Sequence, residues 1–162
     1  AYSAVVNGGV LNRPQIVERI EDRRGRVVQE FPRAQVGRVF SRKTCDTTRE
    51  ILKGVVERGT GRRARIDGWT VGGKTGTARK LIGGRYSDKH HYASFVGFAP
   101  VEFPRAVALI SVDDPKGAYY GGTVAAPSVG RLLSRTMASM DVPRSEPSLA
   151  GVPRGGGAGR GR

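Results

Sequence analysis

The sequence predicts an α/β fold in which an antiparallel sheet is flanked by helices. Two apolar runs of strand-like composition, residues 92–99 and 106–112, are joined by a short connection that is bounded by Pro100 and Pro104, which suits an antiparallel hairpin. Two segments with apolar residues at helical spacing, about residues 44–58 and 123–140, precede and follow these runs. An apolar sheet face must be covered, so we expect a helix to pack on the sheet.

Composition limits the kinds of protein that this chain can be. Its 162 residues suffice for one domain of ordinary size with a hydrophobic core. Lys and Arg number 28 against 14 for Asp and Glu, so the formal net charge is +14; this balance favours anionic partners, although a GC-rich genome that uses Arg freely gives the same balance. The single cysteine, Cys45, excludes an internal disulfide and a cysteine metal cluster. The longest apolar run, residues 106–110, is far too short to span a membrane.

The first third of the chain predicts short elements. Residues 1–9 look like the last turn of a helix that stops at Asn-Gly-Gly. The chain does not begin with Met, so we expect a C-terminal piece of a longer protein, with any targeting signal upstream. Residues 16–21 and 26–31 are β-like runs around a polar turn that contains Gly, which predicts a hairpin.

Residues 44–58 have the clearest helical pattern in the first half of the chain. Thr47 and Glu50, three residues apart, resemble a capping box, and Thr44 is the alternative cap. Gly59 is a natural helix stop. Four apolar residues fall on one face of this helix: Ile51, Leu52, Val55 and Val56.

The remaining segments predict loops and one further helix. Residues 59–68 are basic, and residues 80–91 are polar and contain Gly83-Gly84, so both are expected to be loops or hairpin tips. The second helix runs from about Thr123, its possible cap, and has Pro127 in its first turn. Its predicted apolar stripe consists of Val129, Leu132, Leu133, Thr136, Met137 and Met140. The Gly- and Arg-rich tail, residues 144–162, is expected to be disordered, which leaves residues 1–143 as the folded portion.

The most informative stretch, Gly72 to Thr77, has two incompatible interpretations. With Gly68 it fits G-x-x-x-x-G-K-[ST], the phosphate-binding P-loop of an NTPase. It also contains Lys74-Thr75-Gly76, the third signature of active-site serine acyltransferases. A strand that ends at Asp113 adds to the P-loop case, because such a strand positions magnesium in those enzymes.

The surroundings of Lys74 argue against the P-loop. A P-loop lies between a buried strand and a helix whose N-terminus faces the phosphates. Residues 62–68 are basic and polar, and only six residues separate Gly76 from Gly83, so no useful helix fits there. The acyltransferase interpretation instead places Lys74 on a strand, and the β-branched residues around it favour that. A P-loop NTPase is kept only as a remote alternative.

Five blocks in order resemble one family: residues 72–80, 92–100, 113–115, 119–122 and 125–127. Together they are similar to the transpeptidase domain of class B penicillin-binding proteins, with the septal, FtsI-type proteins as the best match. The resemblance covers roughly residues 1–143. It implies the penicillin-binding protein and serine β-lactamase type of transpeptidase fold, of which this chain would supply the C-terminal half.

The resemblance implies roles for the Lys-Thr-Gly-Thr segment. In this family a serine attacks the penultimate carbonyl of a peptide that ends in D-Ala-D-Ala, forms an acyl-enzyme and passes the acyl group to an amine. Lys74 would supply positive charge, and the Thr75 hydroxyl would hold the substrate carboxylate. Gly76 would let the substrate lie against the strand, and the Thr77 backbone N–H would form half of the oxyanion hole, while its Oγ would also hold the carboxylate.

The same resemblance implies further predictions about binding partners and location. Tyr119, Tyr120 and Gly121 match an aromatic wall beside the active site, and Tyr92 is expected to join it. Expected partners are peptidoglycan stem peptides, β-lactams and divisome membrane proteins, the last through an N-terminal part that also anchors the protein at the periplasmic face of the inner membrane. Neither a cofactor nor a metal is expected, because His90-His91 lacks a third ligand. Nucleic acid is not an expected partner.

Two of the family's motifs are absent from the printed sequence. No serine has Lys three residues later, and none has Asn two residues later. We therefore expect the nucleophilic Ser-x-x-Lys and the Ser-x-Asn to lie upstream of Ala1, so that this chain alone cannot be acylated. The rival interpretation is a non-catalytic module, either a degenerate penicillin-binding relative or a protein that uses its basic tail on an anionic polymer.

Overall fold

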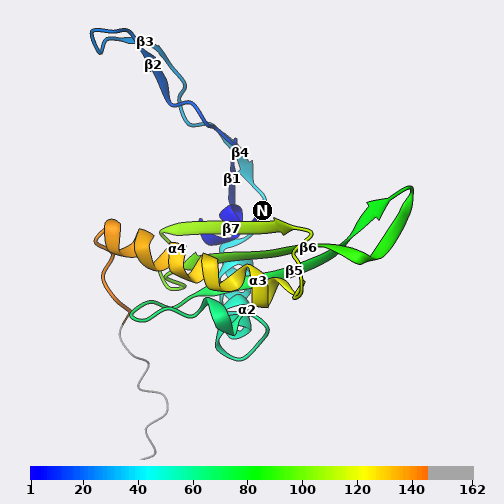
Figure 1. The fold of residues 1–162 in the computed structure, drawn as a ribbon. Coiled ribbons are helices and arrows are strands. Elements are labelled where there is room, and N and C mark those ends of the chain that lie inside the picture. Colours follow the sequence, from blue (N-terminus) through cyan, green and yellow to red (C-terminus); the bar gives the residue numbers. More distant parts are fainter. Residues whose placement is uncertain (146–162) are drawn as a thin grey trace, which may run out of the picture.

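The structure is a computed structural model that describes residues 1–145. At its centre is an antiparallel sheet in the order β5-β6-β7, formed by β5 (Gly72–Ile82), β6 (Arg85–Ala99) and β7 (Ala106–Asp113). Helix α4 (Ala126–Ser139) covers one face of this sheet (Figure 1), and α2 (Arg42–Glu57) packs against β5. The predicted α/β arrangement, an antiparallel sheet flanked by helices, is confirmed.

The core lies on both faces of β6. Phe95 and Phe98 are fully buried and belong to different clusters of apolar side chains. The Phe95 cluster includes Leu133 and Met137 of α4, and the Phe98 cluster includes Leu52 of α2. Both helices are thereby fixed on the sheet, because burial of large apolar side chains is the main favourable term in folding. The sheet that carries the Lys-Thr-Gly segment is therefore a rigid support.

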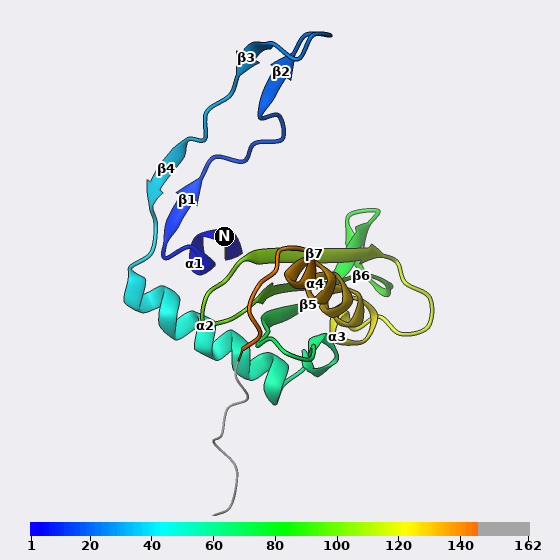
Figure 2. The ribbon, with the colours of Figure 1, turned by 90° about the vertical axis from the view of Figure 1, so that its left-hand side faces the viewer.

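The N-terminal segment extends away from this sheet as an arm. After α1 (Tyr2–Val6), strand β1 (Val10–Asn12) pairs with β4 (Gln35–Arg38), and β2 (Arg19–Glu21) pairs with β3 (Val27–Glu30). Figure 2 shows this arm projecting beyond the β7 edge of the sheet. The predicted hairpin and the short N-terminal helix are confirmed.

Helix α2 begins earlier than the sequence predicted. Ser41 is its N-cap, and the Ser41 hydroxyl accepts a hydrogen bond from the Thr44 backbone N–H at 3.0 Å. The predicted caps, Thr47 and Thr44, are both wrong because they lie inside the helix. A Ser N-cap needs no acidic residue three positions later. The capping-box pattern of Thr47 and Glu50 therefore pointed to a turn inside the helix instead of to its start.

The predicted second helix is two helices. A short α3 (Gly121–Val124) precedes α4, which begins after Ala125, so Thr123 is not the cap, whereas Pro127 does lie in the first turn. Val129, Leu133 and Met137 are buried as predicted. Leu132 and Met140 were assigned to the same stripe wrongly, since they are 47% and 45% exposed.

Residues 80–91 form the end of the β5–β6 hairpin, which is the second of the two structures predicted for them. β5 continues to Ile82 and β6 resumes at Arg85, so only Gly83 and Gly84 form the turn, with φ of 57° and 79°. Two central residues with positive φ are the requirement of a type I′ hairpin. The strands are polar here because they project past α4 into solvent, as Figure 1 shows.

Two other segments refine the sequence interpretation. The basic loop at residues 59–68 contains a 3-10 turn, η1 (Arg62–Ala64). At the start of the predicted tail, the Arg144 guanidinium lies 5.7 Å from the ring of Trp69, and the Ser145 N–H donates to the Gly68 carbonyl at 2.7 Å. The rest of that tail, residues 146–162, lies outside the described residues.

Candidate active site

The Lys-Thr-Gly segment lies on β5, and this position excludes a P-loop. Lys74 pairs with Val96, and Thr77 pairs with Ala93, in a continuous antiparallel ladder. A phosphate-binding loop would instead curl around its ligand before a helix. Within residues 1–145, β5 pairs only with β6, so its second edge has no strand partner. An unpaired strand edge offers backbone donors and acceptors to an extended peptide.

Thr75 and Thr77 share one face of β5, and Lys74 lies on the other, because successive side chains on a strand alternate. The Thr75 hydroxyl lies 3.1 Å from the Thr60 hydroxyl, so either can donate to the other. The Thr77 hydroxyl accepts a weak hydrogen bond from the Gly121 N–H at 3.4 Å. Both threonine hydroxyls are thus oriented by polar partners and retain lone pairs or protons for a ligand.

Lys74 is exposed and is not committed to a carboxylate. Its Nζ donates to the Thr75 carbonyl at 3.0 Å, and no ion pair to Asp or Glu forms within the part of the chain that the structure describes. The ammonium group therefore remains available to a group outside these residues. Lys74 does not line the same hollow as Thr75 and Thr77.

Two glycines allow the segments of the site to approach closely. A Cβ at Gly121 would collide with the Ser94 carbonyl and lie 2.6 Å from the Gly76 carbonyl. A Cβ at Gly76 would collide with the Ser94 hydroxyl. A side chain at position 76 would therefore force the Ser94 hydroxyl to move, whereas one at position 121 meets backbone atoms. Together these contacts place α3 directly over β5.

The hollow formed in this way has a volume of about 320 Å³. It is lined by Thr60, Arg62, Arg63, Thr75, Thr77, Tyr120 and residues 121–123. Sequence reasoning named Thr75, Thr77, Tyr120 and Gly121 but missed Thr60 and both arginines. The basic character of residues 59–68 was visible in the sequence, yet only the contact between η1 and α3 shows that this loop reaches β5.

The aromatic residues of the predicted wall do not all come together. The rings of His91 and Tyr119 stack with centroids 4.3 Å apart, and those of Tyr119 and Tyr120 lie 4.5 Å apart. The Tyr119 hydroxyl donates to the Tyr120 hydroxyl, and this hydrogen bond raises the pKa of Tyr119. Tyr92, next to His91 on β6, has the opposite orientation and lies under the Lys80 ammonium, 5.1 Å from its ring centroid. His91, which was predicted to be a solvent-exposed loop residue, instead supports the wall.

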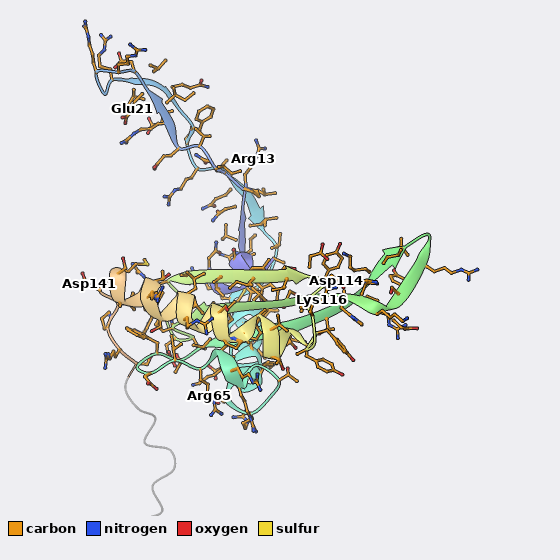
Figure 3. The ribbon with its side chains drawn as sticks, viewed as in Figure 1. Arg13, Glu21, Arg65, Asp114, Lys116 and Asp141 are labelled. Atoms are coloured by element: carbon orange, nitrogen blue, oxygen red, sulfur yellow. The ribbon has the colours of Figure 1, made fainter. Side chains whose placement is uncertain are left out.

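Ionic contacts tie the end of β7 to its neighbours. His90 Nδ1 lies 2.9 Å from Asp114 Oδ1, and Lys116 Nζ lies 3.0 Å from Asp114 Oδ2; these two contacts lower the pKa of Asp114 to about 2. Figure 3 labels Asp114 and Lys116 near the base of the β5–β6 hairpin. A hydrogen bond to Asp113 raises the pKa of Lys80. Asp113 is the last residue of β7, and Asp114 follows it with a positive φ of 50°; within residues 1–145 no three metal-binding side chains gather.

A larger hollow of about 710 Å³ lies away from the Lys-Thr-Gly strand. It is lined by Pro100, Glu102, Phe103, Arg105 and residues 140–145, so it holds none of the motif residues. The smaller hollow is lined by four threonines and two arginines, and this polar, basic lining makes that hollow the candidate site.

Comparison with known proteins shows the family to which the chain belongs. The family model of the penicillin-binding protein transpeptidase domain matches residues 1–134. The chain belongs to this family, and its relatives place it in the transpeptidase domain of a class B penicillin-binding protein. The resemblance read from the sequence blocks is thereby confirmed.

Curated relatives are similar over nearly the whole chain. The chain is 42% identical over 144 residues to stage V sporulation protein D of Bacillus subtilis, covering 88% of this chain and 22% of the relative. It is 35% identical over 152 residues to the probable peptidoglycan D,D-transpeptidase PenA of Neisseria gonorrhoeae, covering 93% of this chain and 24% of the relative. The chain thus spans less than a quarter of the length of these relatives.

Solved structures confirm the predicted transpeptidase fold. Penicillin binding protein 3 of Mycobacterium tuberculosis, complexed with ampicillin, has a TM-score of 0.81 and 33% identity, covering 91% of this chain and 35% of that chain. The transpeptidase domain of Burkholderia pseudomallei penicillin-binding protein 3 has a TM-score of 0.72 and 36% identity, covering 90% of this chain and 42% of that chain. No described helix is long and apolar enough to cross a membrane.

Proposed function

We propose that this chain forms one wall of the active site of a serine-type peptidoglycan D,D-transpeptidase. The observation that carries the proposal is the pair of hydroxyls on Thr75 and Thr77, which face one hollow from a strand whose second edge is unpaired within the described residues. A stem peptide that ends in D-Ala-D-Ala would lie along this edge as an added strand. Its terminal carboxylate would accept charge-assisted hydrogen bonds from the two hydroxyls.

The reaction divides into two acyl transfers. A serine hydroxyl attacks the carbonyl of the penultimate D-Ala, the terminal D-Ala leaves with a proton, and an ester remains on the serine. An amine of a second stem peptide then attacks the ester carbonyl and forms the cross-link; the C–O bond to the serine breaks, and a proton lost by the amine restores the serine hydroxyl. The Thr77 backbone N–H would donate to the carbonyl oxygen as negative charge develops on it. Lys74 would supply positive charge beside the nucleophile.

No serine in the printed sequence has Lys three positions later, so the proposal assigns the nucleophile to residues outside it. We propose that these residues form the Ser-x-x-Lys and Ser-x-Asn sides of the site, and that the segment 1–143 completes it. The proposal also includes a role in septal wall synthesis with divisome membrane proteins, and action at the periplasmic face of the inner membrane. The proposed transpeptidase activity is supported by two similar proteins, which are named as a probable peptidoglycan D,D-transpeptidase and as a sporulation protein.

β-Lactams would enter the same site as substrate mimics. The similar protein from Mycobacterium tuberculosis was solved with ampicillin, which supports this extension to the present chain. The β-lactam carbonyl would take the place of the scissile carbonyl, and its carboxylate would take the place of the substrate's C-terminus. The serine would then be held as a stable ester.

Acylation of the full-length protein by a fluorescent penicillin tests the proposal. Thr75→Val and Thr77→Val should each slow acylation on the order of 10- to 100-fold, because each removes a hydrogen bond to a charged group. Thr47→Val on the exposed surface of α2 is the matched control and should leave the rate unchanged. A wild-type protein that takes no label contradicts the function, whereas full-rate labelling of both β5 variants contradicts only their role.

A further inference from the structure

The hollow beside β5 contains two arginines that the transpeptidase roles assigned above leave unused. Arg62 and Arg63 both belong to η1 and line the hollow together with Thr75 and Thr77. They belong to a separate turn that ends at Ala64, before β5 begins at Gly72, so their arrival at the same hollow is a result of the fold. The inference that follows rests on the proposed function and extends it.

The turn that carries these arginines is firmly anchored. Ala64, the last residue of η1, is fully buried against α4, where a Cβ at Gly130 would lie 3.0 Å from the Ala64 carbonyl oxygen. On the other side, Arg65 donates to the Val56 carbonyl at 3.2 Å and also to the Glu57 carbonyl. Figure 3 labels Arg65 on the side of the sheet away from the arm. An anchored turn presents its side chains at a defined position, which lowers the entropy cost of binding.

The two guanidinium groups have no carboxylate partner within residues 1–145. Arg62 donates to the Arg58 carbonyl at 3.0 Å, and neither Arg62 nor Arg63 forms an ion pair there. No Asp or Glu of the described chain lines the hollow. Two arginines and four threonines therefore line the same hollow without an internal anion. Such a set of donors is complementary to a carboxylate, which a guanidinium binds through paired hydrogen bonds.

We propose that Arg62 and Arg63 make this hollow an anion subsite that recognises the terminal carboxylate of the acyl-donor peptide or β-lactam. The threonine hydroxyls of β5 orient the carboxylate, and the arginines supply the charge that attracts and retains it. A volume of about 320 Å³ accommodates a carboxylate and its adjacent atoms but is small for a large polyanion. The two arginines are thus specificity residues for substrates with a free C-terminus.

The test compares a penicillin with its methyl ester on the full-length protein. The two probes share the reactive ring and differ only in the charge of the group that the hollow should bind. The double substitution Arg62→Ala, Arg63→Ala should slow acylation by the acid roughly tenfold and leave the slower reaction of the ester unchanged. The acid reaction of the wild type should also slow with added salt, and the variant should lose most of that dependence.

Two further variants make the result decisive. Arg135→Ala removes one exposed charge from α4 outside the hollow and should react like the wild type with both probes. If the alanine pair fails to fold, Arg62→Gln, Arg63→Gln takes its place, because it keeps most of the side-chain volume. Equal slowing of acid and ester, or no slowing of the acid, overturns the proposal. A wild type that reacts with neither probe contradicts the transpeptidase function instead.

Discussion

Replacement of Gly121 by alanine tests how closely α3 must approach β5. The new Cβ would collide with the Ser94 carbonyl and lie 2.6 Å from the Gly76 carbonyl, whereas ordinary van der Waals contacts at such positions begin at 3.4 Å. Both obstacles are backbone atoms of paired strands and cannot move independently, so α3 must shift by roughly 1 Å. Overpacking of this kind costs about 1–3 kcal/mol. A shift of about 1 Å at a catalytic wall lowers a rate on the order of 100-fold.

Gly54→Ala is the matched control for this prediction. A Cβ at Gly54 in α2 would meet only the movable guanidinium of Arg58, at 3.1 Å from Nη2. Alanine in a helix interior is favoured over glycine by about 0.5–1 kcal/mol, so this variant should be more stable than the wild type. Urea unfolding followed by circular dichroism gives the two free energies, and penicillin acylation gives the rates. A Gly121→Ala protein with wild-type stability and rate would refute the packing argument.

Three further predictions concern the elements around the site. Ser41→Ala should destabilise the protein by about 1 kcal/mol through loss of the α2 cap, whereas Thr47→Ala should have little effect; equal losses in urea unfolding would contradict the cap assignment. The pKa of Asp114 is about 2, below its usual value of 3.8, so its contribution to stability is present above pH 4 and is lost as the pH falls from about 4 to about 2. In the Asp114→Asn variant, the melting temperature should therefore fall less between pH 4 and pH 2 than it does in the wild type. An equal fall in both proteins would contradict this. His91→Ala should slow acylation roughly two- to tenfold and His91→Phe should restore it, since a stacked pair is worth about 0.5–1.5 kcal/mol; failure of the phenylalanine to restore the rate would argue against stacking.

The sheet and the position of Lys74 could be predicted from local patterns. β6 and β7 have continuous apolar runs bounded by prolines, and the distance from Gly76 to Gly83 left no room for the helix of a P-loop. These features depend on residues that lie within about ten positions of one another in the sequence, and over that range periodicity and turn residues are informative. The family resemblance came from the order of several such blocks, and the comparisons confirm it.

Features that depend on distant contacts could not be predicted. The polar composition of residues 80–91 left a loop and a hairpin tip as alternatives, and only the pairing of β5 with β6 shows that the strands continue to residues 82 and 85. The cap at Ser41 was missed because a later Thr with Glu matched the capping pattern better. Arg62 and Arg63 were visible only as basic loop residues, since their approach to Thr75 depends on the packing of η1 against α4.

The central claim is that the strand from Lys74 to Thr77 holds the carboxylate of the acyl donor. The most direct measurement is a crystal structure of the full-length protein acylated by a penicillin. The account predicts that the penicillin carboxylate lies within about 3.2 Å of the Thr75 and Thr77 hydroxyls. It also predicts that the ester carbonyl oxygen accepts a hydrogen bond from the Thr77 backbone N–H. An acyl group whose carboxylate points away from β5, with both hydroxyls unoccupied, would contradict the account.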